Sequence, residues 1–547
     1  MMENKRLLTL SFTAIVLTAL FIIGLRINSP LDQDQAIFPM AANSIINGKT
    51  MSLIVSPPLY PAILALCVKI AGNSEAVIRL PGIISFIATL SFIFFIGRKI
   101  YPNAAPQAII LACLLCAIHP MSLQGALIPD IDNTIMIPVI LLVISALISF
   151  QPQRRLSWIT AIGAMALLFT VKLTTSTMFA VIFIAYLSIK PQRRITARQT
   201  AIITCIGFAV FISAWYIVSQ ATGWNFSEPF RFILFRSKIS IVTPISDYSA
   251  FCKNIVFFLA WFNPCLAAAI CAAIIKPDNA DKGDTIVKIF FLTVIAYILL
   301  TPIHFGFPKY YVPMVSLSAI LAIPYLNQLN IITLTRKNIF SVAALIFAGF
   351  AFFYFPYDPI YIIRYYIREL SLYLPERDLT PIVIFHALKI SLTYALPALI
   401  IYLILIRNGI KSFKTALITA SLLSLSALTA LQTNAPYNVS HSYGETMTAQ
   451  AISYIKSQIK EDSIVIAPSN ITYYINNRKG FDPAMWHDKA KILLTMKNKN
   501  TKIVAWSVAA NDVETCQMLI YNPEINRYLR CNFIQNQIGT HTIWVRR

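Results

Sequence analysis

The sequence predicts a helical protein that crosses a membrane many times and ends in a small water-exposed α/β domain. Three observations lead to this fold class. Of the 547 residues, 57% are hydrophobic and only 12% are charged, and the mean hydropathy is +0.67, which ordinary soluble domains do not reach. Apolar runs long enough to cross ~30 Å of hydrocarbon recur from Leu7 almost to Gln432. After Gln432 the composition turns polar.

The net charge of +22 is distributed as in a membrane protein. Lysine and arginine gather in short clusters between apolar runs, as at Arg98-Lys99 and Arg154-Arg155. This is the positive-inside pattern of cytoplasmic loops, and it differs from the continuous basic stripe that binds nucleic acid. We therefore expect membrane lipids rather than nucleic acid as partners, with the amino terminus inside the cell.

The clusters also set the number of spans, which we expect to be about thirteen. We place them near residues 7–25, 79–97, 106–122, 133–150, 156–171, 174–189, 200–219, 254–275, 286–302, 310–326, 339–356, 380–406 and 412–431. Residues 59–72 are too short to span and carry Lys69, and counting them would reverse the charge bias. We predict that they form a helix on the membrane surface. The tail after Gln432 then lies outside, which gives a membrane domain at 1–432 and an external domain at 433–547.

The first external segment, residues 26–78, contains the strongest candidates for chemistry. Asp32 and Asp34 come just outside the first span, followed by apolar residues at helical spacing up to Gly48 and then by Pro57-Pro58-Leu59-Tyr60. A carboxylate beside an apolar helix is partly desolvated, which makes it a better proton acceptor. The alternative is that the two aspartates only cap the short helix.

A second external segment, residues 121–133, contains Asp130 and Asp132. Two carboxylates at the mouth of an apolar helix are costly to bury unless they are paired or liganded, which suggests a site. Alternatively, Asp132 or Asn133 caps the helix that follows. An Asp-x-Asp pair can also bind a divalent metal through its oxygens.

An ordered set of short blocks in the first hundred residues resembles the start of a known family. The blocks are Asp34, Phe38, Ala42, Ile45-Ile46, Gly48, Pro57-Pro58-Leu59-Tyr60, Arg79-Leu80-Pro81 and Gly97-Arg98-Lys99. They are similar to the dolichyl- or polyprenyl-phosphate-sugar transferases, the C-type glycosyltransferases that include protein mannosyltransferases and the lipid A aminoarabinose transferase.

The resemblance implies roles for particular residues. Asp34 would be the base or a metal-contacting group, with Asp32 second and Asp132 or Asp130 as partner. Asp34 and Asp132 would be the candidate ligands of a divalent metal. Pro57, Pro58, Tyr60 and Arg79 would belong to the donor-binding loop. One position departs from the family, since many members place a lysine before the Pro-Pro pair where this chain has Ser56.

Three cations are candidates to bind the lipid phosphate. Lys172, at the junction of two apolar runs, matches a lysine that the family carries near its lipid-phosphate site, and Lys309 resembles a lysine at a helix entry. Arg231 lies among phenylalanines in an external segment. Lys172 could also simply extend to the lipid headgroups, and Arg231 could bind anionic headgroups instead.

Taken together, the resemblance implies a hexosyl- or pentosyltransferase of the bacterial inner membrane. It would move a sugar, with inversion, from a polyprenyl-phosphate donor to lipid A, a glycan or a protein on the outer face. A transporter or flippase of lipid-linked saccharides would share the spans and buried charges. A non-catalytic assembly subunit is a third interpretation.

The external domain reads as an α/β module. Strands are predicted at 463–467, 472–475 and 503–508, helices at 449–459, 487–497 and 512–521, and a terminal hairpin at 528–545. Cys516 and Cys531 are its two cysteines, and we predict that they form a disulfide if the compartment is oxidising.

Overall fold

The structure is a computed structural model, and it describes part of the 547-residue chain. The described residues are 2–24, 27–28, 31, 33–48, 59–117, 119–132, 134–189, 195–227, 230, 283–300, 312–327, 399, 402–403, 406, 448–460, 462–475, 489–507, 522–539 and 541–547. The spans predicted near 254–275, 339–356 and 412–431, most of that near 380–406, and the helix predicted at 512–521 lie outside these residues.

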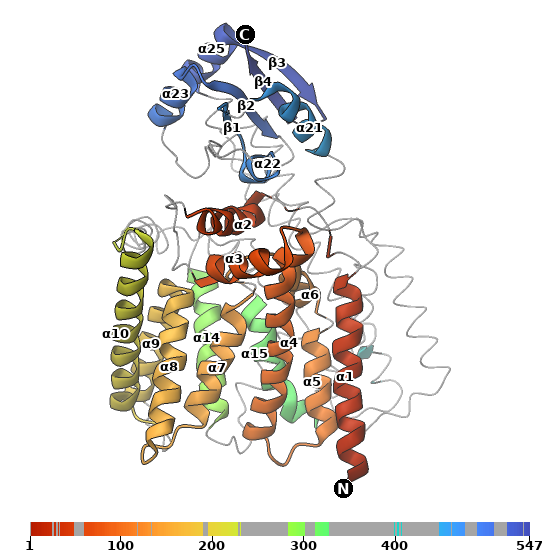
Figure 1. Cartoon of the computed structure of the whole chain (residues 1–547). Coiled ribbons are helices and arrows are strands. Elements are labelled where there is room, and N and C mark those ends of the chain that lie inside the picture. Colours follow the sequence, from red (N-terminus) through yellow and green to blue (C-terminus); the bar gives the residue numbers. More distant parts are fainter. Residues whose placement is uncertain are drawn as a thin grey trace.

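Nine helices of the described part run roughly side by side as a bundle (Figure 1). They are α1 (Met2–Gly24), α4 (Glu75–Ile100), α5 (Pro106–Ala117), α7 (Met136–Ile148), α8 (Arg155–Val171), α9 (Leu173–Ile189), α10 (Ala197–Thr222), α14 (Asp284–Leu300) and α15 (Val312–Leu326). Each lies where the sequence predicts a span. Within the described residues, α4 and α10 are the helices whose length and apolar composition suffice on their own to cross a membrane.

Two short helices lie across the end of the bundle that faces the C-terminal domain (Figure 1). They are α2 (Gln33–Ile46) and α3 (Leu59–Ala71). A helix is therefore found where the sequence predicts one at 59–72, as α3, and it runs crosswise to the bundle (Figure 1). Its place on the membrane surface stays a prediction. The helix α6 (Pro120–Leu127) lies near the same end. It packs so closely on α4 that a Cβ added at Gly82 would stand 2.4 Å from the Ala126 carbonyl oxygen.

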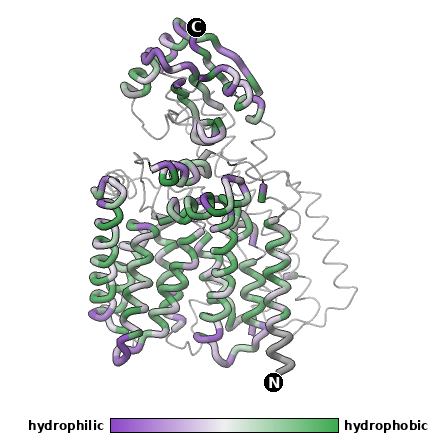
Figure 2. Tube along the Cα trace, in the orientation of Figure 1, coloured by the Kyte–Doolittle hydropathy of each residue, from purple (hydrophilic) through white to green (hydrophobic). Residues whose placement is uncertain are grey.

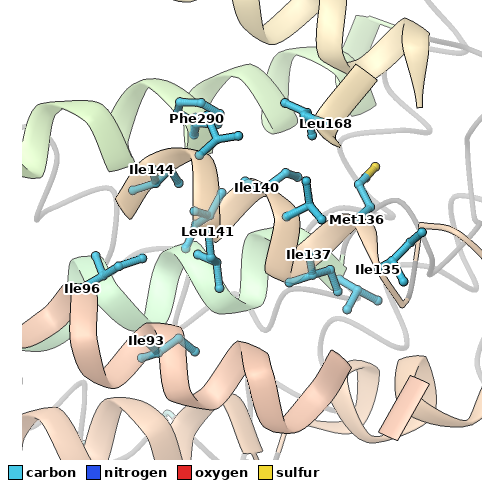
Figure 3. Close-up of a cluster of buried hydrophobic side chains, with 14 of the residues drawn as sticks. Ile93, Ile96, Ile135, Met136, Ile137, Ile140, Leu141, Ile144, Leu168 and Phe290 are labelled. Atoms are coloured by element: carbon cyan, nitrogen blue, oxygen red, sulfur yellow. The ribbon is translucent and has the colours of Figure 1, made fainter. Parts of the chain in front are cut away.

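The core of the bundle is a continuous set of branched apolar side chains. Figure 3 shows Ile93 and Ile96 of α4 beside Ile140 and Leu141 of α7, with Phe290 of α14 on the other side. All five are buried, and they fix the positions of the helices that lead to the outer end. The outward face of α10 is also apolar (Figure 2), as expected of a helix in contact with lipid.

The described basic clusters lie at the end of the bundle opposite the C-terminal domain. Arg98-Lys99 ends α4, and Arg154-Arg155 stands at the start of α8. Both helix ends are hydrophilic in Figure 2. The basic clusters and the C-terminal domain therefore lie at opposite ends of the bundle. The external location of the C-terminal domain stays a prediction.

The C-terminal domain contains a four-stranded sheet in the order β1-β2-β4-β3. β1 (Ile464–Ile466) is parallel to β2 (Thr501–Ser507), and β4 (His541–Arg546) is antiparallel to both β2 and β3 (Phe533–Ile538). Its helices are α21 (Thr448–Gln458), α22 (Ser469–Tyr474), α23 (Lys489–Lys497) and α25 (Pro523–Asn532). Buried side chains cover both faces of the sheet, which makes this part of the chain an α/β unit as predicted.

Two details of this domain differ from the prediction. The strand predicted at 472–475 is wrong, because these residues end α22, where contacts with the membrane domain outweigh the β-propensity of threonine and tyrosine. The terminal hairpin begins at Phe533 rather than at Tyr528. Asn522 caps α25, since its side chain accepts from the N–H groups of Glu524 and Ile525, and this helix takes up residues 528–532.

The predicted disulfide receives no support from the structure. Cys531 in α25 is exposed and carries a free thiol. Cys516 lies outside the described residues.

Candidate functional site

The second acidic segment, between α6 and α7, holds two carboxylates with different tasks. The Asp130 carboxylate accepts a hydrogen bond from the backbone N–H of Asp132 at 2.8 Å. The main-chain carbonyl oxygen of Asp130 accepts one from the Thr134 hydroxyl at 2.5 Å. A carboxylate that accepts the amide two residues later closes an Asx turn. Asp130 thus shapes the segment that carries Asp132.

Asp132 forms an ion pair with Lys172, and the Oδ1 to Nζ distance is 2.6 Å. The side chains are 7% and 17% exposed, so the pair is largely shielded from water. The helix cap that the sequence allowed is not made by Asp132, because α7 begins at Met136 and its cap residue, Ile135, makes no side-chain capping bond. Asp132 is held instead by a cation from another part of the fold.

Lys172 stands at a break between α8 and α9. Its backbone is extended, with φ −157° and ψ 108°, and the Ser176 hydroxyl bridges the carbonyls of Leu168 and Lys172 at 2.7 and 2.5 Å. The break turns the lysine toward the acidic segment, 40 residues earlier in the chain. The ammonium is therefore directed to a carboxylate rather than to the lipid headgroups.

Tyr60, at the start of α3, is fully buried, and its hydroxyl lies near Thr134 and Asp130. Burial raises the pKa of the Tyr60 phenol above its ordinary value, and the nearby Asp130 charge adds to the effect. The phenol therefore stays protonated. Its ring meets Phe38 of α2 edge to face, with the ring centres 5.2 Å apart. Tyr60 thus lies between the first acidic segment, which it meets through Phe38, and the second, which it meets near Thr134 and Asp130.

Arg79 of α4 is only 1% exposed and is bound to main-chain oxygens. Its Nε donates to the Leu127 carbonyl at 2.9 Å, and its Nη1 donates to the Ile27 carbonyl at 2.8 Å. One guanidinium therefore connects the end of α6 to the segment between α1 and α2. Through these two hydrogen bonds, Arg79 holds the two acidic segments together.

Asp34 lies in the first turn of α2, four residues before Phe38. Its backbone therefore lies one turn from the residue that packs on Tyr60, and its side chain is outside the described part. Of the other predicted site residues, Asp32, Pro57, Pro58, Arg231 and Lys309 lie outside the described residues. The structure thus brings together Tyr60, Asp130, Asp132 and Lys172, with Arg79 tying the two segments.

Three residues at the site were not singled out from the sequence. Thr134 supports Asp130, and a threonine following Asp-x-Asp-Asn is the signal that could have indicated it. Glu75, the first residue of α4, accepts a hydrogen bond from the Tyr474 hydroxyl at 3.2 Å. Tyr474 belongs to the C-terminal domain, and no local pattern connects it with Glu75.

Comparison with known proteins identifies the fold. Residues 55–217 match the dolichyl-phosphate-mannose-protein mannosyltransferase family. The chain is similar to the crystal structure of ArnT from Cupriavidus metallidurans bound to undecaprenyl phosphate, with a TM-score of 0.58 and 12% identity over 98% of this chain and 97% of that chain. The chain has the C-type glycosyltransferase fold.

The apo form of the same Cupriavidus metallidurans ArnT is similar to the same degree, with a TM-score of 0.58 and 14% identity over 98% of this chain and 97% of that chain. No curated protein matches the chain. The chain is a multi-pass membrane protein. At 12% and 14% identity, the two structures show the fold alone. The matched family segment runs from α3 into α10, and it includes Tyr60, Arg79, Asp132 and Lys172.

No three His, Cys, Asp or Glu side chains among the described residues gather as a metal site would require. A cavity of about 20 Å³ is lined partly by Thr89, Ser122 and Ser316. It has room for water rather than for a lipid.

Proposed function

We propose that the protein is an integral membrane glycosyltransferase that moves a sugar from a polyprenyl-phosphate donor to a cell-envelope acceptor. The observation that carries the proposal is the Asp132–Lys172 ion pair. It unites two distant segments at the end of the bundle nearest the C-terminal domain, beside the buried Tyr60 of the donor loop. The fold and the family match are those of membrane enzymes with lipid-linked donors.

A shielded ion pair is a costly way to join two segments of a chain. Taking two charges out of water costs several kcal/mol per ion, and apolar side chains of similar volume often stabilise a protein as well or better. Charged residues inside membrane proteins accordingly tend to mark functional sites. The Asp132–Lys172 pair fits this rule, because its local backbone turn and helix break both serve to bring the two charges together.

Lys172 suits the task of a phosphate contact. An ammonium has three N–H donors, so it can bond Asp132 and a phosphate oxygen at once. Asp132 is then the orienter of the lysine, and Lys172 stabilises the negative charge that grows on the departing lipid phosphate. Lys309 and Arg231 are the proposed additional phosphate contacts, on the ground of the sequence alone.

Asp34 is the proposed base. It takes the proton of the acceptor hydroxyl while the acceptor oxygen attacks the anomeric carbon, and the bond from that carbon to the phosphate oxygen breaks. Attack from the face opposite the phosphate inverts the anomeric centre. The phosphate is already a good leaving group, so the reaction needs no separate acid. Asp34 and Asp132 are also the candidate ligands if a divalent metal takes part.

The acceptor class follows from location. With the C-terminal domain and both acidic segments outside, the acceptor is an envelope molecule on the outer face of the bacterial inner membrane: lipid A, a glycan or a protein. The sugar is a hexose or a pentose. The transferred group and the acceptor are to be identified by mass spectrometry of lipid A and envelope glycans from a deletion strain.

The decisive experiment uses the purified full-length protein in detergent with a radiolabelled polyprenyl-phosphate sugar and an envelope lipid extract. Transfer of the label to an acceptor supports the proposal, because no compartments exist in detergent. A transporter or flippase of lipid-linked saccharides would move the donor across a vesicle membrane and leave the label on the polyprenyl phosphate. That pair of results would overturn the enzyme assignment.

A further inference from the structure

Tyr474 of the C-terminal domain reaches the main chain of the first acidic segment. Its hydroxyl accepts the backbone N–H of Leu31 at 2.7 Å and donates to the Glu75 carboxylate at 3.2 Å. A phenol has one donor and can accept as well, so the same oxygen serves both partners. It bonds residues that lie 443 and 399 positions earlier in the chain.

Leu31 is a fixed point of the external segment. Its side chain is completely buried, and the carbonyl of Ile27, four residues earlier, is held by Arg79. Arg79 and Glu75 lie one turn apart on α4. One helix end therefore holds the segment directly through Arg79 and indirectly through the Glu75–Tyr474 bond.

The helix α2 starts at Gln33, two residues after Leu31, and Asp34 is its second residue. The position of the Leu31 amide thus sets where α2 begins. A second contact from the same domain supports this placement, since the Thr472 hydroxyl lies 3.6 Å from the Met40 sulfur of α2. The helix α22 therefore holds α2 at its start and again along its length.

The geometry points to Tyr474 as a positioning residue for Asp34, supplied by the C-terminal domain. This inference rests on the proposed function, because it is the transfer reaction that needs Asp34 at a fixed place. Displacement of a reacting group by about 1 Å can cost roughly 10²-fold in rate. The external domain is then an integral part of the site, and it acts through one phenolic oxygen.

Tyr474→Phe removes both hydrogen bonds and keeps the ring that packs edge to face on Tyr473, 5.1 Å away. The matched control is Tyr473→Phe. The Tyr473 hydroxyl donates to the Asn73 side chain at 2.9 Å, in the exposed turn between α3 and α4, so the control removes a bond between the same two domains that does not touch the first acidic segment.

Two measurements on the full-length protein in detergent test the inference. We expect Tyr474→Phe to lower kcat for sugar transfer by roughly 10-fold or more, with the KM for the polyprenyl-phosphate sugar within about twofold, because orientation rather than donor binding is lost. Hydrogen exchange of the peptide that covers residues 27–34 should quicken by at least about tenfold. Tyr473→Phe should leave kcat and the exchange of that peptide within about twofold of wild type.

The outcomes distinguish failure of the positioning role of Tyr474 from failure of the proposed transferase function. If wild type transfers sugar and Tyr474→Phe keeps both its kcat and its slow exchange, the positioning role is overturned. If exchange quickens and kcat does not change, the contact is structural and the inference is equally overturned. If wild type transfers no sugar at all, the proposed function fails, and the exchange data alone decide whether Tyr474 holds the segment.

Discussion

The two acidic segments at the end of the bundle that faces the C-terminal domain are held in different ways. The second one, around Asp130 and Asp132, is fixed mostly by its own turn and by a lysine within the membrane domain. The first one, which leads to Asp34, is fixed by side chains that come from α4 and from the C-terminal domain. The second segment is therefore held by partners within the membrane domain, whereas the first also depends on Tyr474, 443 residues after Leu31 in the sequence.

This difference suggests that the two acidic segments have different functions. A segment with local bonds and a nearby ion pair keeps its shape when distant parts loosen, which suits the group that orients a phosphate-binding lysine. A segment fixed from outside can respond to the domain that covers it, and local stability is known to vary across a fold in this manner. The following changes weaken one of the two segments or the link between them.

The largest effect is expected for Asp34→Asn in the first segment. Loss of the base should lower transfer by ~10²- to 10⁴-fold, because an amide takes no proton from the acceptor hydroxyl. Radiolabel transfer by purified protein is the measurement, with the thermal transition as a check of folding. Asp32→Asn is the matched variant, two residues earlier. If Asp32→Asn carries the loss and Asp34→Asn retains near-normal transfer, the base assignment moves to Asp32.

The second change removes the cation of the second segment. Lys172→Met should lower kcat by about 10²-fold, the typical loss for one group that stabilises transition-state charge. It should also lower stability, since it leaves the buried carboxylate of Asp132 without its ammonium. Detergent melting and transfer assays measure the two effects separately.

A double variant distinguishes a structural role of the Asp132–Lys172 pair from a role in the reaction. Asp132→Asn combined with Lys172→Met removes both charges, so we expect it to melt at a higher temperature than Lys172→Met alone. Transfer should stay low, because no cation meets the phosphate. Recovery of transfer together with stability would show that the ion pair is only a structural link.

Arg79 joins the two segments, and its replacement tests whether it is a clamp. Arg79→Lys keeps the charge but cannot direct two separate N–H groups to Ile27 and Leu127 as a guanidinium does. The free energy of unfolding should fall by about 1–3 kcal/mol for the carbonyl left unsatisfied, with donor KM little changed. A large rise in donor KM at unchanged melting temperature would instead support the donor-loop role that the sequence resemblance implies.

Acid should loosen the first segment before the second. His541 in β4 is 1% exposed, and burial lowers its pKa to about 4. The unfolded chain, with an ordinary pKa near 6.5, binds the proton first, so stability falls as the pH drops from about 6.5 toward 4, by up to roughly 1.4 kcal/mol per pH unit. Above pH 6.5 the contribution of His541 to the free energy of unfolding no longer changes with pH.

Hydrogen exchange over this pH range reports which segment responds. After correction for the intrinsic pH dependence of exchange, residues 27–34 should lose protection as the C-terminal domain loosens, and the peptide that covers residues 128–135 should keep it. His541→Gln should flatten the change, because a neutral amide does not titrate. Equal loss of protection in both peptides would contradict the division between the segments.

The sequence was sufficient to predict the features that depend on composition, which are the positions of the bundle helices and of α3. Apolar runs located the described helices of the bundle, and Lys69 together with the charge bias set α3 apart from them. It could not separate Asp130 from Asp132, since two identical residues in one turn have the same local pattern and only the partner differs. That partner is Lys172, 40 residues away, and the break that turns it toward Asp132 shows no glycine or proline.

In the C-terminal domain, local β-propensity led to a wrong prediction. Thr472 to Ile475 reads as a strand because threonine, tyrosine and isoleucine favour strands. The structure makes a helix there, since Tyr473 and Tyr474 bond Asn73, Glu75 and Leu31 in the membrane domain. Contacts across nearly the whole chain are invisible to a local pattern. The error therefore falls at the place where the two domains meet.

The smallest effect is expected at Asp130, and it decides what the carboxylate there is for. Asp130→Asn keeps a side-chain oxygen that can accept the Asp132 amide, so the turn should survive. Transfer should stay within about twofold of wild type. Asp130→Ala removes the acceptor, which should cost about 1 kcal/mol and disturb the approach of Asp132 to Lys172.

The contrast between these two variants is the informative quantity. If the turn alone matters, asparagine is tolerated and alanine is not, and the ranking holds in both melting and transfer assays. If Asp130→Asn lowers transfer as strongly as Asp130→Ala, the negative charge beside Tyr60 takes part in the reaction. The second segment would then contribute two functional carboxylates, as the sequence first allowed, rather than one carboxylate and the turn that presents it.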